Sequence, residues 1–414
     1  MSSTLLTDQS IEKLLGSPAV QRAFSYFDSR AEVITEEQIQ INSIPAPRFG
    51  ETERAEYLRR RFSALGLTEA QLDEEGNCVA VRVGFSGAPL LVVSAHLDTV
   101  FPADADVIPR RVGAKLFAPG IADDACGLAA LIAVAGALQS CEIETDGSIL
   151  FVGTVGEEGE GNLRGVRHLL TKSTWAGSID AFVSFDGSGL DRITNAALGS
   201  RRYRVQFRGS GGHSWSEFGV ANPIHALARA VARLVSYPAA NEPRTTFNVG
   251  RIEGGQSINA IPSEASMYVD LRSASADELL KLDAYFRRSV REAADEENAG
   301  RRNGTEPLAV VTELIGERPG GETRAEDPLV QLAWAATEIV GGKPELDRAS
   351  TDSNLPISLG LPAITLGGGG TSANSHTPDE WYDPSGRAAA LKRALLVILG
   401  TVGLRAKSKV MSTE

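Results

Sequence analysis

The sequence predicts an α/β protein in which helices cover a mostly parallel sheet. Short apolar runs at residues 89–95, 148–155, 181–185 and 362–366 lack the alternation of a half-exposed strand. Such runs are typical of strands that are buried on both faces, as in parallel sheets. The stretch 198–317 begins instead with polar and apolar residues that alternate, which indicates a second domain inserted into the first.

Length and composition limit what this chain can be. With 414 residues, it is too long for one typical core, so we expect two domains. A hydrophobic fraction of 42% and a charged fraction of 23% are ordinary for a globular protein. The formal net charge of −12 repels the phosphates of nucleic acids and anionic membranes, so we expect neither as a partner.

The cysteines and the apolar stretches favour a cytoplasmic protein. Cys78, Cys126 and Cys141 are odd in number and lack metal-type spacing, which disfavours a disulfide framework and a thiolate zinc site. Residues 1–17 are too polar and acidic for a signal peptide. The apolar stretch 125–137 is shorter than a membrane span. We therefore expect a reducing compartment and no membrane contact.

Two helices are predicted around the first buried strand. A Pro-rich loop leads into a helix in which Ala55, Leu58 and Phe62 recur at helical spacing. After the strand at 89–95, the Ala- and Gly-rich segment 125–139 predicts a helix that covers the sheet.

The inserted segment begins with a half-buried antiparallel strand, because Tyr203, Val205 and Phe207 share one face. Asn222 and Pro223 then have the residue types of a helix start. The order strand, helix, strand, strand, helix, strand predicts a split βαβ sandwich of the ferredoxin-like type. The later elements are expected at 245–252, 265–271, 277–292 and 308–315, and the domains at 1–197 and 318–414 (catalytic) and 198–317 (inserted).

Residues that can bind metal ions follow the predicted strands at their C-terminal ends. His96 closes the first run, Glu157 and Glu158 follow the second, and Asp186 follows the third. Open α/β sheets place their sites at this edge. Imidazole and carboxylate ligands suit Zn²⁺, so the sequence predicts a metallohydrolase. The remaining candidates are Asp98, Asp123, Asp124 and His376.

The motifs HLDTV, GIADD, GEEG, SFDG, GGHSW, NAIP, VDLR, ERP and NSHTPDEW, in this order, resemble those of the co-catalytic dizinc exopeptidases. This family includes peptidase T, aminoacylase and glutamate carboxypeptidase, and the resemblance covers nearly the whole chain. It implies two Zn²⁺ ions, with Co²⁺ or Mn²⁺ as substitutes. One ion would be held by His96, Asp123 and Asp186, and the other by Asp123, Glu158 and His376. Asp123 would bridge the ions, and the aspartate at 186 is closest to peptidase T-like enzymes.

Residue chemistry assigns a role to Asp98, and the resemblance supports the roles of the other neighbouring acids. Asp98 would accept the proton on the second ring nitrogen of His96 and fix its tautomer. Glu157 would be the general base, and Glu158 the ligand. From residue type alone, either Asp123 or Asp124 can bridge; the family places the first on the metals and leaves the second a structural role.

In the inserted domain, the resemblance implies that His213 crosses from a partner subunit and helps to bind the oxyanion of the tetrahedral intermediate. Asn259 and Arg318 would contact substrate. Arg272 matches a motif too, but a strand-end ion pair explains it equally well. A homodimer through this domain is therefore expected.

With the resemblance, these residues imply an exopeptidase, such as an aminopeptidase, that cleaves the amide bond of short peptides through a metal-activated water. Which end of the peptide it attacks stays open. Two enzymatic alternatives use the same site: an N-acyl amino acid amidohydrolase and a carboxypeptidase. A metal-binding relative without turnover is the alternative from another class, and the intact Glu157 argues against it.

Overall fold

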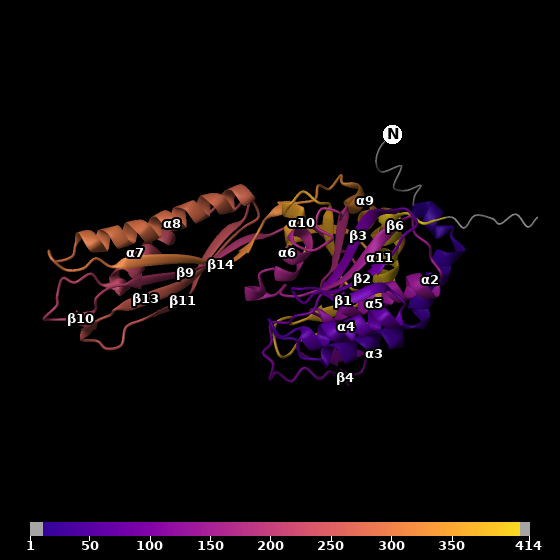
Figure 1. Ribbon diagram of the computed structural model, residues 1–414, viewed down its shortest axis with the longest axis horizontal. Helices are drawn as coiled ribbons and strands as arrows, with labels where there is room; N and C mark the ends of the chain where they lie inside the picture. The colour runs from indigo at the N-terminus through magenta and orange to yellow at the C-terminus, as the bar shows by residue number, and fades with distance from the viewer. Residues whose placement is uncertain (1–10, 406–414) are drawn as a thin grey trace, which may run out of the picture. The chain divides into compact units, whose positions relative to one another are not determined.

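The computed structural model describes residues 11–405, which form two compact units. Unit 1 comprises the chain up to Ala197 and from Glu322 onward, and unit 2 comprises Leu198–Gly321. Unit 2 extends a few residues beyond the expected limit of 317, because its last strand continues to Arg318 and pairs there with Ser200. Figure 1 shows the chain coloured along its length.

Unit 1 is built on a mixed sheet whose centre is parallel. The strands β6, β3, β7 and β17 are neighbours and run parallel, while β1, β2 and the β8 edge pair with antiparallel neighbours. The predicted mostly parallel α/β fold is thus confirmed. In sheet order the strands are β1 (Thr68–Leu72), β2 (Cys78–Arg82), β6 (Gly147–Thr154), β3 (Gly87–His96), β7 (Ala181–Phe185), β17 (Ala363–Leu366), β8 (Arg192–Ala197) and β15 (Gly321–Glu322), and β16 (Glu345–Ala349) pairs with β8.

Both faces of this sheet are buried, which explains why its strands lack alternation. In β3, Leu91 and Val93 join the large core that includes α5, whereas Val92 joins a second core on the other face. Helix α5 is buried along nearly its whole length, because the sheet lies on one side of it and other helices on the other. Residues 11–15 are helical, and the helices that follow in unit 1 include α2 (Pro18–Ser29), α3 (Ala31–Asn42), α4 (Thr52–Ala64), α5 (Ala125–Ser140), η1 (Gly159–Gly161), α6 (Arg164–Thr171), α9 (Pro328–Ile339), α10 (Asn354–Ser358) and α11 (Arg387–Val402).

A small antiparallel sheet connects two distant loops of unit 1. It consists of β4 (Arg110–Val112), β5 (Lys115–Phe117), β18 (Thr371–Ala373) and β19 (Trp381–Asp383), in the order β18-β19-β5-β4. The pairing of Trp381 with Phe117 brings the loop between β18 and β19 beside the segment that precedes α5. Two loops that carry predicted ligands therefore meet.

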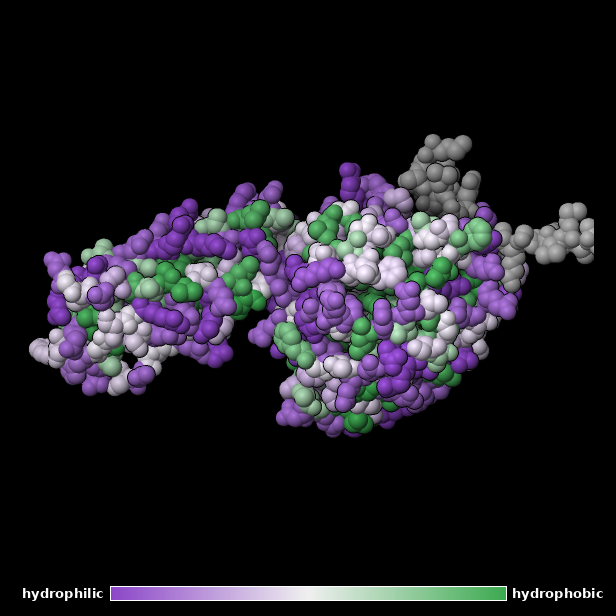
Figure 2. All heavy atoms as spheres, in the orientation of Figure 1, coloured by the Kyte–Doolittle hydropathy of each residue, from purple (hydrophilic) through white to green (hydrophobic). Residues whose placement is uncertain are grey.

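Unit 2 is an antiparallel sheet with two helices on one face. Tyr203, Val205 and Phe207 point into the core beneath the helices, as their alternation predicts. Helix α7 starts at Pro223, and the Asn222 side chain accepts the N–H of Ile224 at 2.9 Å. Figure 2 shows hydrophilic side chains along the outer side of α8. The elements are β9 (Gly199–Arg208), β10 (Gly212–His213), α7 (Pro223–Leu234), β11 (Thr245–Gly254), β12 (Ala260–Ile261), β13 (Glu264–Ser273), α8 (Ala276–Ala299) and β14 (Ala309–Arg318), with β11-β13-β9-β14 as the sheet order.

Among residues 11–405, no helix combines the length and the apolar composition that crossing a bilayer requires.

Candidate metal centre

Three neighbouring parallel strands bring predicted ligands to one edge of the sheet. His96 is the last residue of β3 and lies opposite Thr154 of β6, while Ala95 lies opposite Phe185 of β7. The loop after β6 carries the glutamate pair, and Asp186 directly follows β7. Because the strands end in register, their following residues converge without any long excursion of the backbone.

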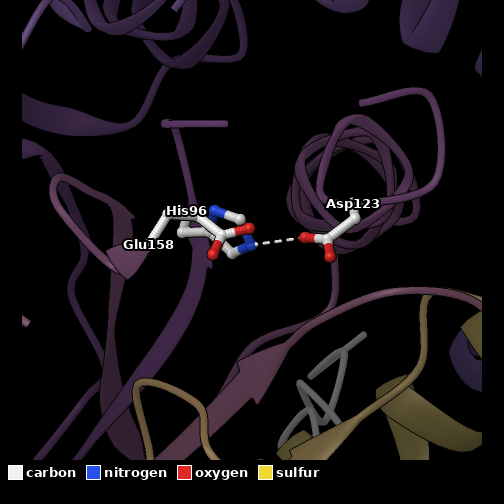
Figure 3. A group of neighbouring side chains, drawn as sticks. All are labelled: His96, Asp123 and Glu158. Carbon is white, nitrogen blue, oxygen red and sulfur yellow. Dashed lines mark hydrogen bonds and ion pairs between the residues drawn. The ribbon is translucent and has the colours of Figure 1, made fainter. Parts of the chain in front are cut away.

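Asp123 contacts the imidazoles of both predicted ligand histidines. Its Oδ1 lies 2.9 Å from Nε2 of His96, a contact marked by the dashed line in Figure 3. Its Oδ2 lies 3.1 Å from Nε2 of His376, and that same nitrogen lies 2.9 Å from Oε1 of Glu158. A carboxylate that offers one oxygen to each histidine has the arrangement that a bridging ligand needs.

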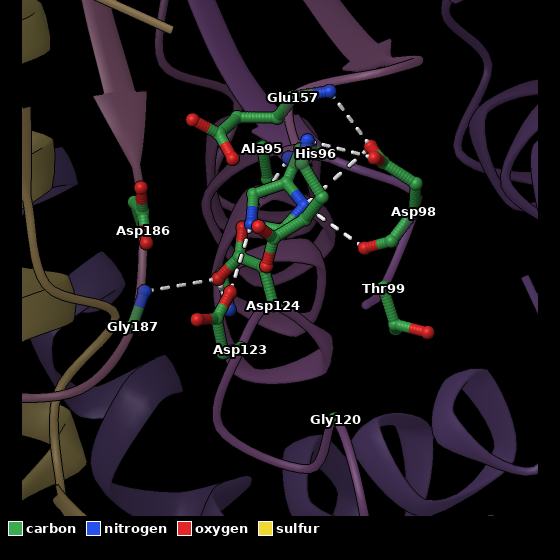
Figure 4. Close-up of polar contacts among 12 residues, drawn as sticks. Ala95, His96, Asp98, Thr99, Gly120, Asp123, Asp124, Glu157, Asp186 and Gly187 are labelled. Carbon is green, nitrogen blue, oxygen red and sulfur yellow. Dashed lines mark hydrogen bonds and ion pairs between the residues drawn. The ribbon is translucent and has the colours of Figure 1, made fainter. Parts of the chain in front are cut away.

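Two overlapping groups of side chains could each hold an ion. His96, Asp123 and Glu158 offer ligand atoms within 4.8 Å of one another, and so do His96, Asp124 and Asp186. In Figure 4 Asp186 stands at the end of β7, beside Gly187. The structure therefore brings the five predicted ligands into one cluster at the sheet edge.

The contacts of Asp124 separate it from Asp123, to which it is joined by a cis peptide bond. Its Oδ1 accepts the N–H groups of Gly127 and Gly187, each at 3.1 Å, and its Oδ2 accepts the N–H of His96 at 3.3 Å. Asp124 thus caps α5 and ties the ends of two strands together (Figure 4). Backbone donors already occupy the oxygens of Asp124, whereas those of Asp123 face the two histidines.

The spacing of the cluster suits metal ions of the zinc type. Ligand atoms that lie 2.0–2.2 Å from a tetrahedral ion are about 3.4 Å apart. The contacts of Asp123 and Glu158 with the two histidines, at 2.9 to 3.1 Å, would open by only a few tenths of an ångström. Imidazole and carboxylate donors are the ligands that Zn²⁺, Co²⁺ and Mn²⁺ accept.

Asp98 contacts the site through both its backbone and its side chain. The Nδ1 atom of His96 lies 3.0 Å from the backbone carbonyl oxygen of Asp98 and 3.7 Å from its carboxylate. The carboxylate instead accepts the N–H of Glu157 at 2.9 Å and the N–H of Glu158 at 2.8 Å. The backbone of Asp98 therefore holds the imidazole, and its side chain holds the glutamate loop.

Glu157 is buried beside the cluster, yet it belongs to neither ligand group. In Figure 4 its carboxylate points away from Asp98, toward the side of Asp186. A carboxylate held near a metal site without serving as a ligand is available for proton transfer.

The pKa values in the cluster are shifted because several carboxyl groups are buried close together. Burial raises the pKa of Asp186 to about 7, and the charge of Asp123 adds to the effect. Hydrogen bonds to Asp123 and Glu158 raise the pKa of His376 to about 10. Burial opposes the protonation of His96, but hydrogen bonds to Asp123 and Asp98 outweigh it and raise that pKa well above its ordinary value. The clustered carboxylates therefore favour positive charge on the two imidazoles, as they would favour metal cations.

Sequence reasoning missed Glu380, which is fully buried next to the cluster. Its Oε2 accepts the N–H of Gly120 at 2.9 Å, and its Oε1 accepts those of Ala122 at 2.8 Å and Asp123 at 3.1 Å. Burial raises its pKa to about 7. The available signal was an acid four residues after a candidate ligand, His376, and directly before a strand.

Three predicted site residues belong to unit 2, namely His213, Asn259 and Arg318. His213 is exposed in β10, and its Nδ1 accepts the N–H of Trp215 at 3.2 Å, which leaves the proton on Nε2. Asn259 is exposed and accepts the hydroxyl of Ser257 at 2.7 Å. Arg318 is buried at the end of β14. Their part in the site stays a prediction.

The family of the chain emerges from comparison with known proteins. The model of Peptidase family M20/M25/M40 matches residues 92–402. An uncharacterized protein of Bacillus subtilis strain 168, YqjE, is 27% identical over 347 residues, which cover 80% of this chain and 89% of that protein. Succinyl-diaminopimelate desuccinylase of Nitrosococcus oceani is 29% identical over 231 residues, which cover 52% of this chain and 61% of that enzyme.

Solved structures share the fold over almost the whole chain. Aminopeptidase PepT from Bacillus cereus has a TM-score of 0.73 at 22% identity and covers 90% of this chain and 98% of its own. A tripeptidase from Staphylococcus aureus has a TM-score of 0.74 at 21% identity, with coverages of 89% and 97%. A dinuclear metal-binding peptidase of the M20 family from Bacillus subtilis has a TM-score of 0.65 at 16% identity, with coverages of 91% and 99%.

Proposed function

The chain belongs to Peptidase family M20/M25/M40 and is a metal-dependent hydrolase, and we propose that it is a two-zinc exopeptidase that hydrolyses short peptides. One observation carries this proposal: Asp123 offers a separate oxygen to His96 and to His376. Two ions that share a carboxylate could occupy the places that protons hold between these residues.

The ions would be held by five residues of this chain and would lower the pKa of a shared water and polarise the scissile carbonyl. One ion would take His96, Asp123 and Asp186, and the other Asp123, Glu158 and His376. The contacts of Asp123 with both histidines and of Glu158 with His376 support the second set, and Asp186 lies within ligand distance of His96. Asp98 holds both the imidazole and the glutamate loop in place.

Glu157 is the proposed general base. It takes the proton of the attacking water and later delivers it to the leaving amine. Its burial, its anchoring through Asp98 and its absence from both ligand groups support this role. The presence of such a base also argues against a relative that binds metal without turnover.

Unit 2 is proposed to complete the site from a second subunit. His213 carries its proton on Nε2, as a donor to the oxyanion of the tetrahedral intermediate would. Asn259 and Arg318 are proposed to contact substrate, with the guanidinium holding a carboxylate. This arrangement makes the enzyme a homodimer through unit 2.

The substrate is proposed to be a short peptide cleaved at its amino end. Full-length likeness to a peptidase T and a tripeptidase supports this choice, whereas the desuccinylase matches about half of the chain. The alternatives are an N-acyl amino acid and carboxypeptidase action on the same metal site. A reducing compartment, the cytoplasm, is proposed because the three cysteines are free and buried.

Purified protein with Zn²⁺, assayed against di- and tripeptides and their N-acetylated forms, tests the proposal. Hydrolysis that requires the free α-amine supports an aminopeptidase, and loss of the N-terminal residue must be seen by mass spectrometry. Preference for the acylated forms would replace the peptidase with a deacylase. If no amide is cleaved at any metal concentration, the proposed activity is wrong.

A further inference from the structure

Glu380 joins two loops that lie far apart in the sequence. Its side chain is fully buried, and its two oxygens accept three backbone N–H groups from Gly120, Ala122 and Asp123. Its own carbonyl accepts the N–H of Ala118 at 3.1 Å. The loop between β18 and β19 is therefore anchored, through one residue, to the segment that ends in the bridging aspartate.

This anchor lies where the ligand geometry is set. His376 occupies the same loop, four residues before Glu380, and half of its side chain is exposed. The loop is held internally, because Asn374 donates to the Asp379 carbonyl at 3.2 Å and Thr377 donates to the Asn374 carbonyl at 2.8 Å. A loop that is rigid in itself moves as one piece, so its attachment to the Asp123 segment decides how close its histidine comes to Asp123.

We propose that Glu380 is a positioning residue that fixes the separation of His376 and Asp123, and with it the affinity for the second metal ion. The inference rests on the proposed two-metal site, because the second ion is the one that Asp123, Glu158 and His376 would share. The ion that His96, Asp123 and Asp186 would hold depends much less on this loop.

The chemistry of the three amides explains why a glutamate is needed. Ionised carboxylates accept only, so both oxygens can receive N–H groups, and a cluster of amides that point inward favours an anion. In Glu380→Gln, the amide oxygen can keep Ala122 and Asp123, but the NH₂ group then meets the N–H of Gly120, and two donors face each other. In Glu380→Asp, the carboxylate is one C–C bond, about 1.5 Å, further back.

The test is stepwise loading of the full-length, metal-free protein with Co²⁺, followed by its visible absorption and by calorimetry. Wild type is expected to take up two ions. In Glu380→Gln, we expect the first ion to bind within about threefold of wild type and the second about 10- to 100-fold more weakly, as for other residues that orient metal ligands. The matched control is Asp379→Asn, which removes a negative charge from an exposed neighbour in the same loop and should leave both affinities unchanged.

Different failures have different signatures. Wild type that takes up fewer than two ions would overturn the two-metal site and this inference with it. Wild type that binds two ions, with equal affinities in Glu380→Gln, would overturn the role of Glu380 alone. The role of Glu380 would also be overturned if Glu380→Gln weakened the binding of both ions equally, because a general loosening of the site would then explain the result. The same holds if Asp379→Asn weakened the binding of the second ion as much, because the loss of a negative charge would then explain it. Should Glu380→Gln fail to fold by circular dichroism, Glu380→Asp carries the same expectation.

Discussion

In this protein the carbonyl oxygen of Asp98 lies 3.0 Å from Nδ1 of His96, closer than either oxygen of the Asp98 carboxylate. A main-chain acceptor therefore sets the tautomer that presents Nε2 to the metal centre. The carboxylate, 3.7 Å from Nδ1, accepts the two N–H groups of the glutamate loop. One residue thus aligns two parts of the site, through its backbone and its side chain.

The separate contacts of the Asp98 carbonyl and carboxylate lead to a prediction for Asp98→Asn. The amide oxygen of the asparagine can accept one of the two backbone N–H groups of the glutamate loop. Its NH₂ group would face the second N–H, so that two hydrogen-bond donors would meet. The carbonyl contact with His96 would persist. We expect metal affinity or kcat to fall by about 10- to 100-fold, as for other residues that orient ligands. Isothermal calorimetry and steady-state kinetics measure both, and activity within twofold of wild type would contradict the assignment.

Glu157→Gln tests the proposed base separately from metal binding. The amide keeps the size of the side chain and the backbone bond to Asp98 but cannot take a proton. We expect kcat to fall by about 10²- to 10⁴-fold while two ions still bind. Metal content by atomic absorption, measured on the same sample as the rate, checks this. Loss of metal in the variant would make Glu157 a ligand instead.

Removal of metal should make the stability of the protein fall as pH rises. In the metal-free site the pKa of Asp186 is about 7, against an ordinary value of 3.8, and that of His376 is about 10, against 6.5. A group whose pKa is higher in the folded protein than in the unfolded chain stabilises the folded protein fully at a pH below its unfolded-state pKa. This stabilisation is lost as the pH rises through the folded-state pKa. The losses are therefore expected between pH 3.8 and about 7 from Asp186, and between 6.5 and about 10 from His376.

Metal ions replace these protons, so their stabilising effect should grow over the same range. At a free ion concentration 100 times the Kd, a site contributes about 2.7 kcal/mol. Thermal unfolding of Zn²⁺-loaded and EDTA-treated protein at about pH 5, 6.5 and 8 measures the gap in Tm. A gap that shrinks as pH rises would show that the clustered residues do not exchange protons for metal.

His213→Ala tests the oxyanion role, with His225→Ala as its control. His225 lies in the same unit, with 64% of its side chain exposed, and its nearest acid is 3.9 Å away. Loss of the Nε2 donor should lower kcat by about 10²-fold or more and leave metal binding intact. His225→Ala should retain wild-type kinetics. Equal effects of the two changes would remove His213 from the proposed machinery.

Mixing two inactive variants tests the crossing between subunits. A dimer of one Glu157→Gln chain and one His213→Ala chain contains one complete site if His213 acts across the interface. Random pairing should then restore about a quarter of wild-type activity. No recovery in a mixture that sedimentation shows to be dimeric would place His213 in its own subunit's site or outside catalysis.

Unit 2 should fold on its own. Its two ends are neighbours, because Ser200 near the start of β9 pairs with Arg318 at the end of β14. Tyr203, Phe207 and Phe286 centre a separate apolar core. Residues 198–321, expressed alone, are expected to show helix and sheet in circular dichroism and one cooperative thermal transition. A non-cooperative transition would mean that unit 1 is needed for its stability.

The strands and the ligand types could be predicted because local pattern and burial agree. His96 and Asp186 end or follow strands that are apolar on both faces, and parallel strands bring their C-terminal ends to one edge. The inserted unit could be predicted for a related reason, since Tyr203 and Phe207 alternate with polar residues.

The partners of loop carboxylates could not be predicted in the same way. Asp98, Asp124 and Glu380 all bind backbone N–H groups, and every exposed loop offers such groups. Which N–H groups a carboxylate binds depends on how segments far apart in the chain pack together, and the spacing of apolar residues in the sequence does not indicate this.

By itself, the sequence determined the class of the fold, the edge of the sheet at which the site forms and the residue types that could hold metal, because these follow from local pattern. Only the tertiary structure decided that Asp123 offers a separate oxygen to each histidine, that Asp98 contacts His96 through its carbonyl, and that Glu380 anchors the last ligand loop. Each of these outcomes depends on the pairing of segments far apart in the chain, where a one-residue change in position exchanges one carboxylate for another.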